Sequence, residues 1–237
     1  MFLGSFGLQI LMLAPALLLA LYAQWKVKSS YAKYSRIASS SGLTARQVAE
    51  RILGYGAVSL GQPELRSVRV AALSGTLTDH YDPRDKTLKL SQPDSRSLAD
   101  IGVAAHEAGH ALQDAARYQP LILRSTLVPV AQFGSQLAFP LLLGGIFIPK
   151  FFSLFLLLAI IAYSAAVLFT LVTLPVEFNA SRRAMHLLRQ TGVVTSEKEL
   201  AGVGSMLNAA ALTYVAAAAS AILQLVYYIL VYLQQRR

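Results

Sequence analysis

Residues 106–110 have the types and spacing that can bind and use a divalent metal ion. His106, Glu107 and His110 form an H-E-x-x-H pentapeptide. Residues four apart lie on one face of an α-helix, so the two imidazoles can bind the same Zn²⁺ while the glutamate reaches a water on the metal. The spacing therefore predicts a helix that carries a catalytic zinc site. A polar helical turn without metal is the alternative.

A catalytic zinc site usually has a third protein ligand, and this sequence offers few. The chain has no Cys, and the candidates beyond the pentapeptide are Asp114, Glu177, His186, Glu197 and Glu199. Asp114 lies one helical turn past His110, about 6 Å farther along the axis, which is too distant to complete the site. Glu177 follows an apolar stretch, where a carboxylate is costly unless it is paired or bound to metal. We expect Glu177 to be the third ligand; a glutamate stabilised by the dipole at a helix N-terminus is the alternative.

The composition is that of an integral membrane protein. The chain is 55% hydrophobic and 14% charged, whereas soluble domains carry about 25% charged residues. Four apolar stretches approach the roughly 20 residues that a spanning helix needs. They are residues 2–23, 127–148, 151–174 and 209–233. We expect a multi-pass protein whose main partner is the lipid bilayer.

The distribution of basic residues predicts the topology. No Lys or Arg precedes Lys26, which favours an uncleaved anchor over a signal peptide. Most Lys and Arg residues lie in segments 24–124 and 175–208, which fall on one side of the membrane if all four stretches span it. The positive-inside rule makes that side cytoplasmic, and we expect a bacterial plasma membrane. The net charge of +9 then reflects anionic lipid rather than nucleic acid.

The polar segments predict the elements that position the pentapeptide. Thr44 and Gln47 have capping-box spacing and begin a helix that Gly54 or Gly56 ends. Short strands are expected at 68–70, 73–81 and 87–90. Ser95 or Ser97 caps the helix of the pentapeptide, and residues from Glu177 onward continue as a helix that leaves the lipid. The fold class is mainly α, with about four transmembrane helices and a zincin-like α+β catalytic part that contains a small sheet.

These elements divide the chain into five predicted parts. They are a membrane anchor (1–25), the zincin-like part with the pentapeptide (26–120), a transmembrane hairpin (121–174), a helix with the third ligand (175–208) and a C-terminal transmembrane helix (209–237).

Longer motifs around the metal residues resemble the YugP-like membrane zinc metallopeptidases. The matching stretches are Leu77–Pro83, Ile101–Ala111, Leu174–Ala184 and Ala209–Val215. The resemblance implies a zinc peptidase without naming a substrate. A looser similarity to HtpX-type endopeptidases implies an Asp one turn after the third ligand, where this chain has Ser181. Asn179, Ser181 or a carboxylate such as Asp114 or Asp82 could replace it in orienting a ligand.

The predicted mechanism uses one Zn²⁺ per chain, held by His106, His110 and Glu177. The metal lowers the pKa of its water toward about 7, Glu107 takes the proton, and hydroxide attacks a peptide carbonyl. Candidates for stabilising the transition state or binding substrate are His80, Tyr81, Arg182 and Tyr214. Residues 73–81 could also pair with an extended substrate as an edge strand, an ordinary surface hairpin being the alternative.

The function predicted from these residues is a membrane-embedded zinc endopeptidase of the gluzincin type, acting on membrane-associated proteins or peptides. One alternative is an intramembrane, site-2-type protease, although charged residues flank 101–112 and make that apolar stretch too short to span. Another is a scaffold or chaperone without catalysis, in which zinc is absent or structural with four ligands. Prenyl-protein processing is a variant of the enzyme interpretation.

Overall fold

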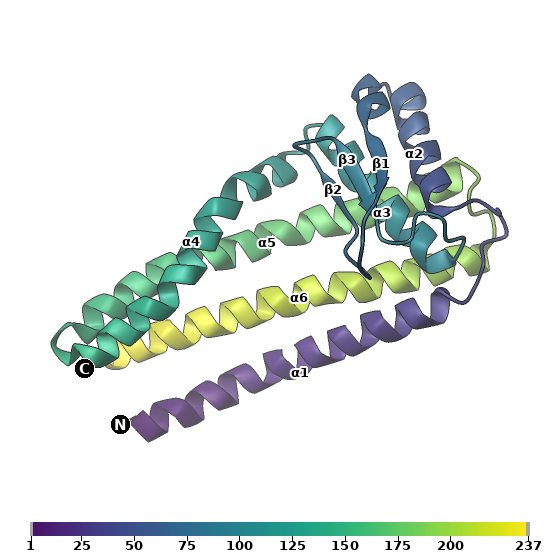
Figure 1. Ribbon diagram of the computed structural model, residues 1–237. Helices are drawn as coiled ribbons and strands as arrows, with labels where there is room; N and C mark the ends of the chain where they lie inside the picture. The colour runs from purple at the N-terminus through teal and green to yellow at the C-terminus, as the bar shows by residue number, and fades with distance from the viewer. Residues whose placement is uncertain (1, 236–237) are drawn as a thin grey trace. The chain divides into compact units, whose positions relative to one another are not determined.

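The computed structural model describes the backbone of residues 2–235 and is mainly helical (Figure 1). The α-helices are α1 (Phe2–Tyr34), α2 (Ala45–Ser59), α3 (Leu98–Ala115), α4 (Gln119–Phe147), α5 (Phe152–Gln190) and α6 (Glu197–Gln234). Two 3-10 helices are η1 (Pro63–Ser67) and η2 (Pro149–Phe151), and three strands are β1 (Arg69–Ala72), β2 (His80–Asp82) and β3 (Thr87–Leu90). The expected mainly helical fold with a small sheet is therefore confirmed.

Four of these helices are long and apolar enough to cross a membrane. The candidate spans are Ile10–Tyr34, Gln119–Phe147, Pro149–Gln190 and Glu197–Gln234. They contain residues 10–23 of the first expected stretch, all but residue 148 of the second, and the whole of the other two. Helix α5 runs through Pro175 without a break and has 39 residues, a length of about 58 Å at 1.5 Å per residue. A hydrocarbon core of about 30 Å covers only part of such a helix.

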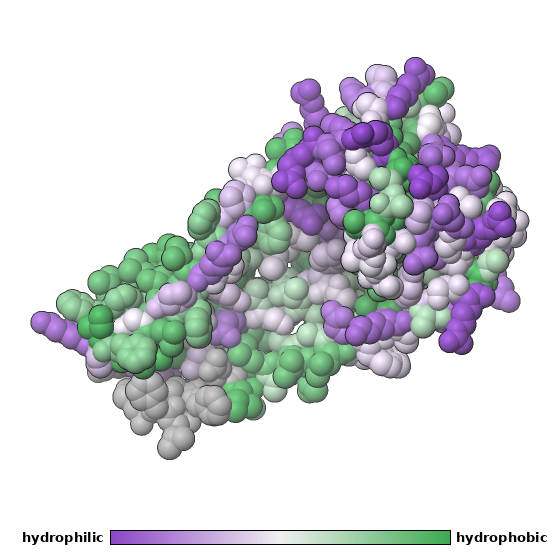
Figure 2. Space-filling view, in the orientation of Figure 1, coloured by the Kyte–Doolittle hydropathy of each residue, from purple (hydrophilic) through white to green (hydrophobic). Residues whose placement is uncertain are grey.

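The chain forms two compact units. The apolar unit comprises Met1–Gln24, Ile122–Pro175 and Leu212–Arg237, and the polar unit comprises Trp25–Leu121 and Val176–Ala211. Figure 2 shows hydrophobic residues over α4 in the first unit and hydrophilic residues over α2 and the sheet in the second. The surface of the first unit therefore suits contact with lipid, and that of the second unit suits contact with water.

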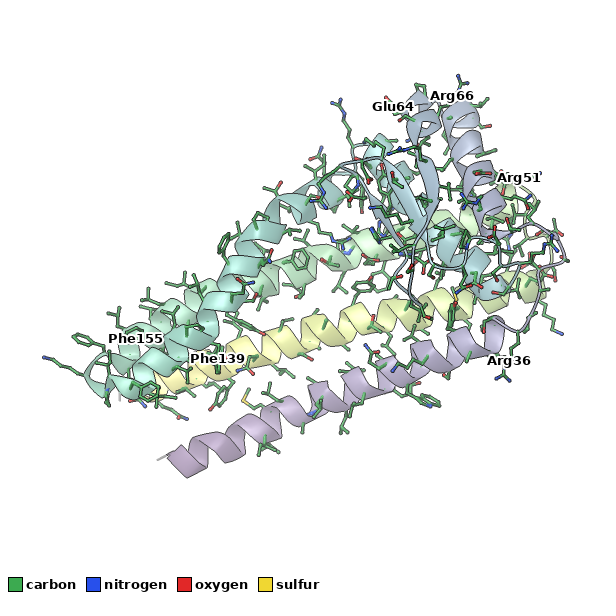
Figure 3. The ribbon with its side chains drawn as sticks, in the orientation of Figure 1. Arg36, Arg51, Glu64, Arg66, Phe139 and Phe155 are labelled. Atoms are coloured by element: carbon green, nitrogen blue, oxygen red, sulfur yellow. The ribbon has the colours of Figure 1, made fainter. Side chains whose placement is uncertain are left out.

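In the apolar unit, α4 and α5 pack closely. A Cβ added to Gly134 of α4 would collide with the carbonyl oxygen of Ala162 on α5, so glycine permits this approach. Small residues at such contacts are typical of helices that pack in lipid. Phe139 of α4, labelled in Figure 3, is 66% exposed, which suits contact with acyl chains.

In the polar unit, the sheet has the strand order β1-β3-β2. Strand β3 is parallel to β1 and antiparallel to β2, with Tyr81 opposite Leu88. Leu88 and Leu90 of the central strand are buried in one core with Ile52 of α2 and Leu112 of α3. Arg51 and Arg66 lie on the outside of this unit in Figure 3. The sheet and α2 therefore support α3.

Two local predictions are wrong. Residues 73–79 are not a strand, because Gly75 and Leu77 have positive φ angles of 120° and 56°. Helix α2 does not end at Gly54 or Gly56 but continues to Ser59. A Cβ at Gly56 would lie 2.5 Å from Leu65 Cδ1, so this glycine serves close packing rather than termination.

The predicted N-caps are confirmed. Thr44 and Gln47 form a complete capping box at α2, and the side chain of Ser97 accepts a hydrogen bond from Asp100 N at α3. The Asp100 carboxylate also accepts hydrogen bonds from the Ser97 and Tyr31 hydroxyls, each at 2.7 Å. The start of α3 is thus tied to the last turn of α1.

We predict that Ile52→Ala destabilises the polar unit, because Ile52 is fully buried and its truncation leaves a cavity. The expected loss is about 2–5 kcal/mol of unfolding free energy, seen as a lower thermal unfolding midpoint in detergent. Val58→Ala on the same helix is the control, since Val58 is 70% exposed. Equal midpoints for the two variants would contradict the assigned core.

Candidate metal centre

Three side chains from two helices converge in the polar unit. His106 and His110 lie on successive turns of α3, with ring centroids 4.8 Å apart and planes at 87°. The Nε2 atoms of His106 and His110 lie 3.2 Å and 3.6 Å from Oε2 of Glu177 on α5. Their candidate ligand atoms all lie within 4.8 Å of one another. The H-E-x-x-H spacing and the expected third ligand therefore meet at one point.

The donor set suits a zinc ion. Two imidazole nitrogens and one carboxylate oxygen are ligands that zinc accepts, and three protein ligands are typical of catalytic sites. No fourth His, Cys, Asp or Glu joins the group among the described residues. Glu177 is 3% exposed, and a buried carboxylate requires positive charge or hydrogen-bond donors nearby. These residues therefore have the chemistry of a metal site rather than that of a polar helical turn exposed to water.

Helices α3 and α5 can approach this closely because residue 109 is glycine. A Cβ on Gly109 would lie 2.7 Å from the carbonyl oxygen of Ala180. A glycine inside a helix destabilises the helix by about 1 kcal/mol relative to alanine. At position 109 the absence of a side chain permits the contact. Ala105 and Ala108, which flank the ligands on α3, are also fully buried. Small side chains on α3 therefore bring Glu177 within reach of both imidazoles.

Each imidazole has a hydrogen-bond partner on its other nitrogen. Ser181 Oγ lies 3.1 Å from His106 Nδ1, and Gln113 Oε1 lies 2.9 Å from His110 Nδ1. Asn179 Oδ1 accepts a hydrogen bond from Gln113 Nε2 at 3.0 Å. Such contacts orient the rings of metal-binding histidines. Ser181, which replaces the Asp of the HtpX-type pattern, lies beside one histidine, and Asn179 acts through an intermediate residue.

Strand β2 holds Glu107, the candidate general base. The backbone N–H of Tyr81 donates to Glu107 Oε2 at 3.0 Å. The Tyr81 hydroxyl donates to Asp114 Oδ2 at 2.7 Å, and Lys86 also binds that carboxylate. Burial and the Asp114 hydrogen bond raise the pKa of Tyr81 above its usual value, so the phenol stays protonated. Asp114 therefore anchors β2 to α3 through Tyr81 and Lys86.

The surroundings of His110 affect its protonation in the absence of metal. Burial alone would lower the pKa of His110, but the carboxylates of Glu177 and Glu107 and the amide of Gln113 outweigh burial and raise that pKa. Imidazole binds a metal only in its neutral form. Protons therefore compete with the metal for this nitrogen.

The remaining sequence candidates belong to β2, α5 and α6. His80 is exposed on β2, with Nδ1 2.9 Å from the carbonyl oxygen of Thr78. Arg182 is exposed on α5, and Tyr214 belongs to the apolar unit. Asp82 accepts hydrogen bonds from Arg84, which lower the pKa of that carboxyl group. The partners of His80 and Asp82 in these contacts are thus Thr78 and Arg84 rather than the candidate ligands.

The edge-strand hypothesis for residues 73–81 is reduced to a short segment. Only His80–Asp82 form β2, which lies at an edge of the sheet. The N–H of Tyr81 is already bound to Glu107.

Sequence reasoning also missed Gln113. Its position three residues after His110 places it on the same helix face and could have indicated a contact.

The chain belongs to the family described as "putative neutral zinc metallopeptidase", whose sequence profile matches residues 9–233. It is also similar to a Bacillus subtilis (strain 168) protein named "putative membrane protease YugP". The two are 44% identical over 230 residues, which cover 96% of this chain and 97% of the relative. No solved structure matches the chain. The resemblance drawn from the motifs is therefore confirmed.

We predict that Gly109→Ala weakens zinc binding, because the new methyl group would push α3 away from the Ala180 carbonyl. We expect at least a tenfold loss of affinity, measured by competition with a chromophoric chelator. Gly54→Ala is the matched control, since that helical glycine has nothing within 4 Å of an added Cβ. Unchanged affinity in Gly109→Ala would show that the close approach does not position the ligands.

Proposed function

We propose that this chain is a membrane-embedded, zinc-dependent endopeptidase that cleaves membrane-associated proteins or peptides. The convergence of His106, His110 and Glu177, with Glu107 beside them, is the observation that carries the proposal. The family assignment supports the metal and the class of chemistry. The arrangement has the features of a gluzincin: two histidines on one helix and a glutamate on another.

Zinc, when bound to these residues, supplies Lewis acidity that polarises a peptide carbonyl and makes water more acidic. Glu107 is the general base that accepts the proton of the attacking water and gives it to the leaving nitrogen. Its Oε2 accepts a hydrogen bond from the Tyr81 N–H, which orients the carboxylate. Because β2 supplies this hydrogen bond from its main chain, any residue at position 81 except proline can make it.

The active site lies at the cytoplasmic surface of a bacterial plasma membrane in this proposal. The basic segments that surround the metal ligands support the orientation. Helix α3 carries the pentapeptide and is not among the candidate spans of the described residues. A site beside the membrane is therefore favoured over the site-2-type alternative, in which the pentapeptide lies inside a spanning helix.

A scaffold or chaperone without catalysis is the second candidate. It would require zinc to be absent or structural, and structural zinc normally has four protein ligands. The three-membered group in the described residues favours catalysis. The buried Glu107 supports the same conclusion, because a structural site has no use for a base at 8% exposure.

We predict that removing the charge of Glu107 and removing that of Glu177 have different effects on zinc content. Glu107→Gln should retain zinc by elemental analysis and lose at least a hundredfold in peptide hydrolysis, since it lacks the base. Glu177→Gln should lose zinc. Full-length substrates that accumulate in membranes containing Glu107→Gln, but not wild type, would identify the targets. Retained hydrolysis by Glu107→Gln would exclude the proposed role.

The proposed topology predicts how single introduced cysteines react with a labelling reagent. The sequence contains no cysteine of its own, so each label reports one position. Glu64→Cys in the polar unit should react with an impermeant maleimide only after the cells are permeabilised. Lys150→Cys, between α4 and α5, should react in intact cells. Glu64 and Lys150 are both exposed, so access to reagent is equal apart from the membrane. The reverse labelling pattern would place the active site outside.

A further inference from the structure

A chain of hydrogen bonds links the backbone of α5 to a candidate ligand on α3. The carbonyl oxygen of Val176, the residue before Glu177, accepts a hydrogen bond from Gln113 Nε2 at 2.8 Å. The same nitrogen donates to Asn179 Oδ1 at 3.0 Å, and Gln113 Oε1 lies 2.9 Å from His110 Nδ1. All three contacts lie inside the polar unit. Gln113 thus connects the two helices that supply the ligands.

These contacts determine which way the carboxamide of Gln113 faces. A backbone carbonyl oxygen can only accept a hydrogen bond, so the atom that faces Val176 must be the NH₂ group. The second acceptor, Asn179 Oδ1, also receives a hydrogen bond from Arg183 Nε at 2.8 Å, which fixes the orientation of Asn179. The carbonyl oxygen of Gln113 must therefore face His110.

The orientation of Gln113 determines the tautomer of His110. The Gln113 oxygen has no hydrogen to donate, so Nδ1 of His110 must carry the hydrogen. A neutral imidazole then has its lone pair on Nε2, the atom that faces Glu177. His106 has no such constraint, because its partner is the Ser181 hydroxyl, which can donate or accept.

We propose that Gln113 is a positioning residue that fixes His110 in its metal-binding tautomer and ties it to the segment that carries Glu177. The proposal rests on the zinc site described above. Gln113 is 0% exposed, and an amide buried this deeply persists only when its polar atoms have partners. Glutamine makes all three contacts without adding charge to the site. A carboxylate there would repel the Val176 carbonyl and Asn179 Oδ1.

The test compares zinc affinity in full-length Gln113→Met, Ser181→Ala and Asp100→Asn with wild type, using chelator competition. Methionine keeps the shape of glutamine and removes its hydrogen bonds. We expect Gln113→Met to weaken zinc binding by about tenfold to a hundredfold, and Ser181→Ala to have a smaller effect. Asp100→Asn controls for stability, because Asp100 is a buried polar residue of α3 whose partners are Ser97 and Tyr31.

Nitrogen-15 spectra of labelled histidine give a second readout that a merely structural role would not change. At a pH above the pKa of His110, zinc-free wild type should show His110 with hydrogen on Nδ1 alone, and Gln113→Met should show a mixture of tautomers. The proposal would be overturned if the zinc affinity of Gln113→Met were within about fivefold of that of Asp100→Asn. An unchanged tautomer of His110 would also overturn it. If Gln113→Met does not fold, Asn179→Ala removes one of the two acceptors of Gln113 and should give a weaker form of both effects. Wild type that binds no zinc would instead overturn the proposed function.

Discussion

The close approach of two helix backbones is the contact on which the candidate site depends. At Gly109 and Ala180, α3 and α5 are separated by less than the space that a methyl group needs. Glu177 lies one turn from this contact on α5, and His106 and His110 lie on both sides of it on α3. A larger residue at position 109 would separate the carboxylate from both imidazoles, because helices transmit such a shift along their length.

The position of Glu177 in a long apolar helix gives the site a second constraint. The charge of a carboxylate is costly beside hydrocarbon unless a cation or donors compensate for it. Nε2 of each imidazole of α3 lies within 3.6 Å of that carboxylate, and a bound zinc ion would supply the compensating positive charge. Helix α5 therefore places the candidate ligand Glu177, and the partners that surround it make its charge tolerable.

The small sheet contacts the proposed base, Glu107, through strand β2. Strand β2 is held to α3 by Tyr81, through its hydroxyl bond to Asp114 and its N–H bond to Glu107. Glu107 is consequently oriented by main chain, while the histidines are oriented by the side chains of Ser181 and Gln113. The proposed base and the candidate ligands thus depend on different parts of the polar unit, and a change in one set need not alter the other.

Local patterns in the sequence were sufficient for the H-E-x-x-H helix, its Ser97 cap, the capping box at Thr44 and the four apolar helices, because each depends on residues within a few turns of one another. Glu177 was found by elimination, since a chain without cysteine and with few carboxylates leaves little choice. The positive φ angles of residues 75 and 77 and the packing of Gly56 on Leu65 leave no mark in the residue pattern, and the contacts of Gln113 depend on residues that are distant in sequence. The partner of Gln113 is a backbone carbonyl on another helix, which has no residue type to recognise. Residue spacing therefore determined which side chains are available to bind a metal. Only the packing of α3 against α5 decided which atoms orient those side chains.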